Sequence, residues 1–161
     1  MKKEDVILSC YSILRRRTPL DFDCGKLCGG KCCKGDDGTG MILFPGEENL
    51  IDENIKVVRS ENGFNLAVCN GTCDRNKRPL ACRIYPLFPL YNKDTGEVRV
   101  IPDFRADCEL FKNPVKLNKD FIRGVRRTGK MLLLNSETKG AYLLLCDMFY
   151  EFIDLENKFI K

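Results

Sequence analysis

The fold of this chain depends on residues 24–33, which read CGKLCGGKCC. They lie in a glycine-rich segment, residues 21–40, that shows no apolar periodicity. Such a segment buries too little apolar surface to order itself, so another interaction must hold it. Closely spaced cysteines indicate a metal. We therefore expect a long loop organised by metal binding, in which residues 35–40 (GDDGTG) are a connection and not a nucleotide-binding loop.

Further cysteines extend the pattern along the chain. Cys69 and Cys73 are separated by three residues, and Cys82 and Cys108 follow singly. A short-spaced pair lets one turn of backbone present two sulfurs to one ion, so that only the long loops remain to be closed. The predicted metal ligands are Cys24, Cys28, Cys32, Cys33, Cys69, Cys73, Cys82 and Cys108.

The sequence contains no histidine. This excludes His-ligated zinc, the Ser-His-Asp and Cys-His nucleophile systems, and a histidine general base. Thiolate ligation, with an occasional carboxylate such as Asp103 or Asp107, is typical of zinc or an iron–sulfur cluster and not of magnesium or calcium. Zinc and a 4Fe-4S cluster both remain open as the cofactor.

The adjacent pair Cys32-Cys33 bears on the number of centres. Neighbouring side chains point in different directions, so two adjacent cysteines rarely bind one ion comfortably. Either they serve two centres, or one of them packs inside. Eight cysteines divide into two sets of four, but one four-cysteine cluster with supporting cysteines fits as well. Cys10 and Cys146 lie on the apolar faces of predicted helices, and we assign them to the core.

The remaining sequence predicts one α+β domain over residues 1–161. It has an N-terminal helix, a small core of antiparallel hairpins with long cysteine-rich loops, and a pair of C-terminal helices. Asn62-Gly63 and Asp94-Thr95-Gly96 are typical of hairpin turns, and Asn118 of a helix N-cap. Helices are predicted at 4–17, from 45, at 118–132 and at 138–158; strands are predicted at 41–44, 55–58, 64–68, 87–91 and 97–101.

Residues 78–86, RPLACRIYP, resemble a motif of a known protein family. With the cysteine block, this segment resembles the zinc- or iron-chelating cysteine-cluster family (YkgJ-like), which has a CxxCxxCC-type block, further cysteines and an RPxxCRxYP segment. The match spans about residues 24–108, although here three residues, not two, separate the first cysteines. The resemblance implies that Arg78 and Arg83 donate hydrogen bonds to sulfur or to a bound anion; ordinary surface ion pairs are the alternative.

A related cysteine arrangement occurs in the longer flagellin lysine N-methylases. By analogy, this implies an alternative function: an iron–sulfur-dependent methyl-transfer enzyme or component. The sequence does not decide whether the protein is an enzyme.

The net charge bears on which kinds of partner the protein binds. The formal charge of +4 counts every thiol as neutral; thiolates bound to two zinc ions would bring it to about zero. The basic stripe of Arg123, Arg126, Arg127 and Lys130 on a predicted helix therefore indicates a solvated face more than a nucleic-acid surface. The expected partner is a metal ion or cluster; the sequence also leaves room for a protein partner.

No apolar run is long enough to cross a membrane, and no export signal is evident. We expect a cytoplasmic protein, where a reducing environment favours metal binding over disulfides. An exported disulfide scaffold is the alternative.

Overall fold

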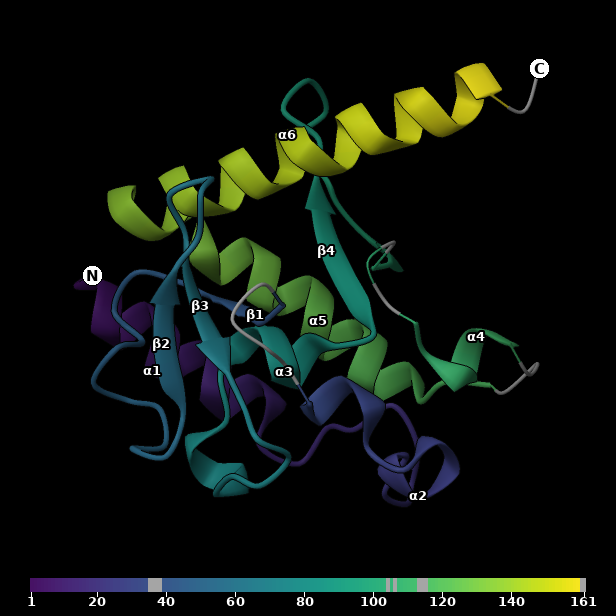
Figure 1. Ribbon diagram of the computed structural model, residues 1–161. Helices are drawn as coiled ribbons and strands as arrows, with labels where there is room; N and C mark the ends of the chain where they lie inside the picture. The colour runs from purple at the N-terminus through teal and green to yellow at the C-terminus, as the bar shows by residue number, and fades with distance from the viewer. Residues whose placement is uncertain (35–38, 104, 106, 113–115, 160–161) are drawn as a thin grey trace.

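The computed structural model of the chain describes residues 1–34, 39–103, 105, 107–112 and 116–159. Its fold is α+β, as predicted, with an N-terminal helix, small antiparallel sheets and two long C-terminal helices (Figure 1). The helices are α1 (Lys3–Leu14), α2 (Gly25–Cys28), α3 (Leu80–Ile84), α4 (Glu109–Lys112), α5 (Lys119–Leu132) and α6 (Ser136–Phe159). The strands are β1 (Met41–Leu43), β2 (Lys56–Arg59), β3 (Asn65–Val68), β4 (Leu87–Tyr91) and β5 (Val98–Pro102), and two 3-10 turns are η1 (Lys31–Cys33) and η2 (Arg75–Lys77).

One sheet has three strands in the order β1-β3-β2. The hairpin β2–β3 aligns Arg59 with Asn65 and turns through Gly63, whose φ of +83° favours glycine. This confirms the hairpin predicted from Asn62-Gly63. β1 joins the other edge of β3, with Met41 opposite Ala67.

The second sheet is the hairpin β4–β5, which pairs Leu87 with Pro102. Helices α5 and α6 pack against it. The Phe88 ring stacks on Phe149 with 3.9 Å between centroids, and the Tyr142 hydroxyl donates to the Pro89 carbonyl. Gly129 of α5 makes this packing possible, because a Cβ there would lie 2.7 Å from the Tyr142 hydroxyl oxygen.

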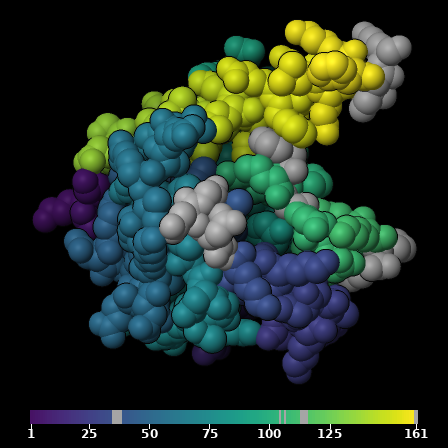
Figure 2. Space-filling model, viewed as in Figure 1, coloured from purple at the N-terminus to yellow at the C-terminus, as the bar shows by residue number. Residues whose placement is uncertain are grey.

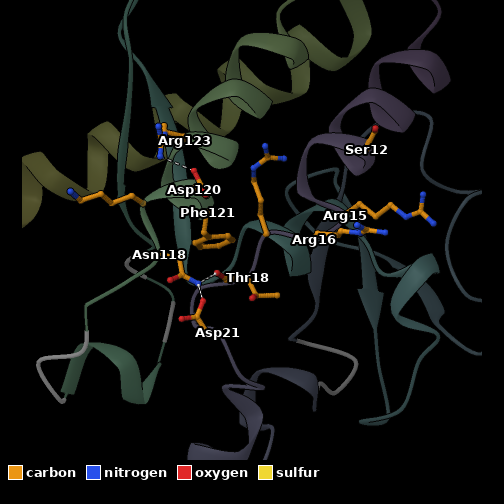
Figure 3. Close-up of a pocket in the computed structure, with 11 residues that line it drawn as sticks. Ser12, Arg15, Arg16, Thr18, Asp21, Asn118, Asp120, Phe121 and Arg123 are labelled. Atoms are coloured by element: carbon orange, nitrogen blue, oxygen red, sulfur yellow. Dashed lines mark hydrogen bonds and ion pairs between the residues drawn. The ribbon is translucent and has the colours of Figure 1, made fainter.

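Helix α1 crosses α5 at Gly124, where a Cβ would lie 3.1 Å from Cδ2 of Leu14 and 2.7 Å from Cδ of Arg17, just after α1. α1 ends at Leu14, three residues earlier than predicted. Asn118 occupies the N-cap position of α5, but its side chain does not cap the helix. Instead its amide donates to the Thr18 carbonyl and the Asp21 carboxylate, which ties the segment after α1 to the start of α5 (Figure 3).

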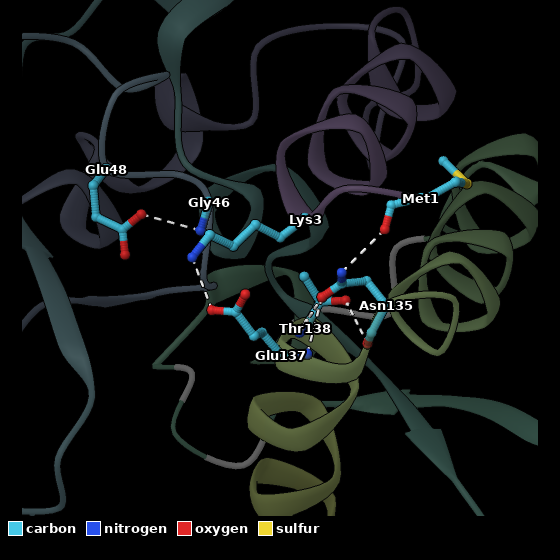
Figure 4. Close-up of polar contacts among 7 residues, drawn as sticks. All are labelled: Met1, Lys3, Gly46, Glu48, Asn135, Glu137 and Thr138. Carbon is cyan, nitrogen blue, oxygen red and sulfur yellow. Dashed lines mark hydrogen bonds and ion pairs between the residues drawn. The ribbon is translucent and has the colours of Figure 1, made fainter.

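Helix α6 begins two residues earlier than predicted because Asn135 caps it. The Asn135 side-chain oxygen accepts from the amides of Glu137 and Thr138, at 2.9 and 3.2 Å. Its amide group donates to the Met1 carbonyl, and Lys3 pairs with Glu137 at 2.8 Å (Figure 4). The N-terminus is thereby fixed to the α5–α6 junction.

Most of the buried apolar side chains form one core between α1, α3, β4, α5 and α6. Cys10 and Cys146 belong to it with no exposed surface, which confirms their assignment to the core. A smaller core of Leu43, Ile55 and Ala67 lies under the three-stranded sheet. In the described part of the chain, no helix is both long and apolar enough to cross a membrane.

Three local predictions were wrong. The segment from residue 45 forms turns and not a helix. The cysteine-rich loop contains the short helix α2 and the turn η1, although its residues 35–38 lie outside the described part of the chain. Helices α3 and α4 were not predicted, since four or five residues carry too little apolar periodicity to recognise.

Candidate thiol metal centre

The eight predicted ligands line two adjoining clefts. The narrow cleft, with a volume of about 20 Å³, is lined by Cys24, Cys28, Cys32 and Cys108. The wide cleft, about 490 Å³, is lined by Cys32, Cys33, Cys69, Cys73 and Cys82. Tyr85 and Asp107 line both clefts, as Cys32 does.

Helix α2 and the glycines after it position the first cysteines. Cys24 is the N-cap residue of α2 and Cys28 is its last residue, so the two lie one turn apart. Gly29 and Gly30 have φ of +64° and +70°. Left-handed backbone at these two successive residues turns the chain, and the 3-10 turn η1, which contains Cys32 and Cys33, follows directly.

Cys108 joins this region through the segment that leads into α4. Lys31 forms an ion pair with Glu109 at 3.2 Å, across a gap of 78 residues in the sequence. Figures 1 and 2 show the segment around α2 (dark blue) beside the segment around α4 (green). The ion pair therefore holds Cys108 next to the cysteines of α2.

Two contacts hold the loop of Cys69 and Cys73 against the first cysteine block. Lys34 and Asn70 form an isolated antiparallel bridge, which places the residues after Cys33 and Cys69 side by side. Arg75 pairs with Asp23 at 2.5 Å. Distant parts of the sequence thus meet at the wide cleft.

Asp52 also fixes the loop that carries Cys69 and Cys73. It is buried, and its carboxylate accepts from the amide of Asp74 at 2.5 Å and from the amide of Asn54 at 2.9 Å. These backbone hydrogen bonds lower the pKa of Asp52. Cys73 packs partly against the small core under the sheet. The loop therefore has a defined backbone path.

Helix α3 carries Cys82 and is anchored by Glu47, which the sequence analysis missed. Glu47 is completely buried. Its carboxylate accepts from the Tyr11 hydroxyl at 2.7 Å, from the Leu80 amide at 2.6 Å and from the Phe44 amide at 2.7 Å. Burial raises its pKa to about 7. No local signal distinguishes Glu47 from its exposed neighbour Glu48.

The two predicted anion- or sulfur-binding arginines have different surroundings. Arg78 lines the wide cleft, and its positive charge acts on the thiol of Cys73. Arg83 donates to the Arg78 and Asn76 carbonyls, both at 2.7 Å, and its guanidinium lies 4.0 Å from the Tyr11 ring centroid. Arg83 thus fixes the backbone on which Arg78 is presented.

Burial and neighbouring charges set the acidity of these thiols. Burial raises the pKa of Cys24, Cys73, Cys82 and Cys108. Of the described cysteines, Cys33 is the one whose pKa is lowered: it accepts a hydrogen bond from Cys32, and Arg78 and Arg75 lie nearby. The same hydrogen bond raises the pKa of Cys32. Cys33 is therefore the thiol of this pair that ionises first.

The two carboxylates named as occasional ligands have cationic partners. Asp103 is nearly buried and binds the guanidinium of Arg105 through both oxygens, at 2.9 and 2.7 Å. Asp107 is exposed and pairs with Lys112 at 2.6 Å. Both line the wide cleft, so each would have to exchange its partner to bind a metal.

The donor set fits a soft metal, although the side chains do not converge. All ten cysteines are free thiols. Among the described residues, no group of three or more Cys, Asp or Glu is arranged to hold an ion. Each cleft nevertheless has at least four thiols in its lining. The chemistry of the donors fits zinc or an iron–sulfur cluster.

A third cleft, about 570 Å³, lies away from the cysteines where α1 ends and α5 begins. It is lined by Arg15, Arg16, Arg17, Lys119 and Arg123, together with two aspartates. Figure 3 shows Arg15 and Arg16 directed away from Arg123, which pairs with Asp120 at 2.7 Å. The other members of the predicted stripe, Arg126, Arg127 and Lys130, are exposed. The expectation that nucleic acid is not a partner stays a prediction.

No protein-family model matches the chain, and searches of curated proteins and of solved structures find no match either. The resemblance to the cysteine-cluster family therefore stays an expectation that depends on residues 24–33 and 78–86. The function has to be inferred from the cysteines and their surroundings.

Proposed function

We propose that the protein binds zinc or an iron–sulfur cluster through thiolates from the eight cysteines between Cys24 and Cys108. The observation that carries this proposal is the sorting of the cysteines. Two are completely buried in the apolar core, and the other eight line two adjoining clefts although they come from four separate segments. Thiols from segments that are far apart in the sequence therefore face the same two clefts.

The contacts that gather these segments support the proposal. The ion pairs Lys31–Glu109 and Asp23–Arg75 and the bridge Lys34–Asn70 each connect two cysteine-bearing loops. Exposed ion pairs are individually weak, about 0–1 kcal/mol each. Two such ion pairs and one backbone bridge stabilise loops that bury little apolar surface only weakly, whereas thiolate–metal bonds would hold them firmly.

The surrounding charges also suit thiolates. A zinc ion with four thiolates carries a net charge of about −2, and a nearby cation offsets it. Arg78 is half-buried beside Cys33, Cys73 and Cys82. Burying a guanidinium is unfavourable unless it has an anionic partner, and thiolates at the wide cleft supply one.

Metal analysis together with an absorption spectrum, on protein purified without oxygen, tests the proposal. We expect zinc or iron in at least equimolar amount; iron would also give visible absorbance that reductant bleaches. Cys73→Ser should lower the metal content, whereas Cys10→Ala and Cys146→Ala, in the core, should leave it unchanged. Protein that contains neither metal, and binds neither when fresh and reduced, would refute the proposal.

The wide cleft gives the methyl-transfer alternative a place for a substrate, because it leaves about 490 Å³ beside the thiols of Cys33, Cys73 and Cys82. This alternative requires an iron–sulfur cluster. It is dismissed if the freshly prepared protein holds zinc and no iron, and cannot be reconstituted with iron and sulfide.

A further inference from the structure

We propose that the protein holds two separate metal centres, divided between the adjacent residues Cys32 and Cys33. This inference rests on the proposed function and extends it. The first centre would use Cys24, Cys28, Cys32 and Cys108 at the narrow cleft. The second would use Cys33, Cys69, Cys73 and Cys82 at the wide cleft.

The linings of the two clefts carry the division. In the described part of the chain, Cys24, Cys28 and Cys108 line the narrow cleft and not the wide one. Conversely, the wide cleft takes in Cys33, Cys69, Cys73 and Cys82, and the narrow one does not. Seven of the eight thiols are therefore assigned by position alone.

Cys32 lines both clefts, and its neighbours assign it. Its side chain interacts electrostatically with Cys28 and Cys24, apart from its adjacent partner Cys33. Cys33, in contrast, is a neighbour of Cys73 and of Cys82. Placing Cys32 at the narrow cleft completes two sets of four thiols, which is the number that a closed zinc site or a 4Fe-4S cluster requires.

Of the three tethers, two connect cysteines of the same set, and the third, Asp23–Arg75, connects the segment of Cys24 to the loop of Cys73 and so joins the two sets. Lys31–Glu109 joins the residue beside Cys32 to the residue beside Cys108, two cysteines of the narrow cleft, although Lys31 itself lines the wide cleft. Lys34–Asn70 joins the residues that follow Cys33 and Cys69, and both belong to the wide cleft. Tyr85, in the segment after α3, lines both clefts and therefore stands where they adjoin.

The two centres should differ in accessibility. The narrow cleft leaves room for little beyond the sulfurs themselves, as in structural zinc sites, which are closed. The wide cleft is open to chelators and oxidants, and Arg78 adds a positive charge that attracts anionic reagents. The second centre should therefore lose its metal first.

Anaerobic titration of the reduced apoprotein with Co²⁺ tests the division, because cobalt thiolates absorb visibly. We expect about two Co²⁺ per chain. Cys28→Ser should remove one equivalent and Cys73→Ser the other, and each single variant should keep the spectrum of the remaining centre. Cys10→Ala serves as the matched control and should bind as the unchanged protein does.

Far-ultraviolet circular dichroism, with Cys24→Ser and Cys69→Ser as second variants in each group, separates ligand loss from misfolding. If the unchanged protein binds only one Co²⁺, and if either variant binds none, the chain has a single shared centre. The proposed division would then be wrong, while the proposed function would stand. No cobalt or zinc binding at all, with no iron incorporated, would overturn both. If the protein is isolated with iron, we expect about eight irons per chain, and each of the same variants should keep about four. About four irons per chain in the unchanged protein, all of them lost in either variant, would overturn the division.

Discussion

Replacing Glu47 with glutamine should change how the stability of the protein depends on pH. Burial raises the pKa of Glu47 from 4.5 to about 7. In the unfolded chain the carboxyl loses its proton near its ordinary pKa, so the folded state holds an extra proton between these two values. The stabilisation from this group is complete below pH 4.5 and is lost as the pH rises through 7.

The magnitude follows from the same two values. One pKa unit corresponds to about 1.4 kcal/mol, so the free energy of unfolding should lose roughly 3 kcal/mol from this group as the pH rises to 8. In Glu47→Gln the amide oxygen can still accept from Tyr11 and Leu80. Its amide group, however, would face the Phe44 N–H, which should cost about 1–3 kcal/mol.

Urea unfolding of both reduced proteins between pH 5 and pH 8, with a chelator present, measures the effect. We expect the variant to be the less stable protein at pH 5 and the gap to close or reverse by pH 8. Metal is left out because the charge of Glu47 acts on the thiol of Cys82, so the substitution would also change how metal binding depends on pH. Glu48→Gln is the matched control, since Glu48 is exposed and accepts from Gly46 at 3.0 Å. A difference between variant and unchanged protein that stays within about 0.5 kcal/mol across this range would refute the reasoning.

Two further predictions concern the helical half. Gly129→Ala should lower the free energy of unfolding by about 1–3 kcal/mol, because its Cβ would lie 2.7 Å from the Tyr142 hydroxyl oxygen and 2.8 Å from Cβ of Pro89. The control is Gly140→Ala, whose Cβ meets no atom within 4 Å and which should raise the free energy of unfolding by up to about 1 kcal/mol. Equal effects of the two substitutions in urea unfolding would contradict this packing. Fluorescence anisotropy should detect no binding to a single-stranded oligonucleotide at about 150 mM salt, and binding that falls steeply with salt and disappears in Arg15→Ala/Arg16→Ala would show instead that the cleft between α1 and α5 is a nucleic-acid surface.

The elements that the sequence predicts well are those set by neighbouring residues. Asn62-Gly63 marks its hairpin because a left-handed turn residue constrains only the strands beside it. The apolar faces of α1 and α6 identify Cys10 and Cys146 as core residues for the same local reason. Each of these predictions needs only a few consecutive residues.

The elements that were missed depend on distant residues. The amide that starts α3 at Leu80 is held by Glu47, 33 residues earlier in the chain. Glycine has a low helix propensity, yet in the structure Gly124 and Gly129 are the points at which α1 and the β4–β5 hairpin approach α5. No window of sequence contains both partners of such contacts.

The same distinction applies to the candidate site. The sequence identifies the eight cysteines and raises the possibility of two sets of four, but it does not say which cysteines belong together. In the division that we propose, membership follows from which cleft each thiol lines, and each cleft is built from loops that are distant in sequence. The resulting sets are interleaved in sequence, because Cys108, the last of the eight, joins the earliest cysteines.

The large core has a consequence for what a bound metal would do. It is formed by side chains of α1, α3, β4, α5 and α6 other than the eight cysteines. Small zinc domains have no such core and unfold entirely without metal. Here removal of metal should instead release the cysteine loops as a separate cooperative unit. Amide hydrogens in residues 21–34 and 69–77 would then exchange faster, while those of α5 and α6 keep the protection of the intact fold.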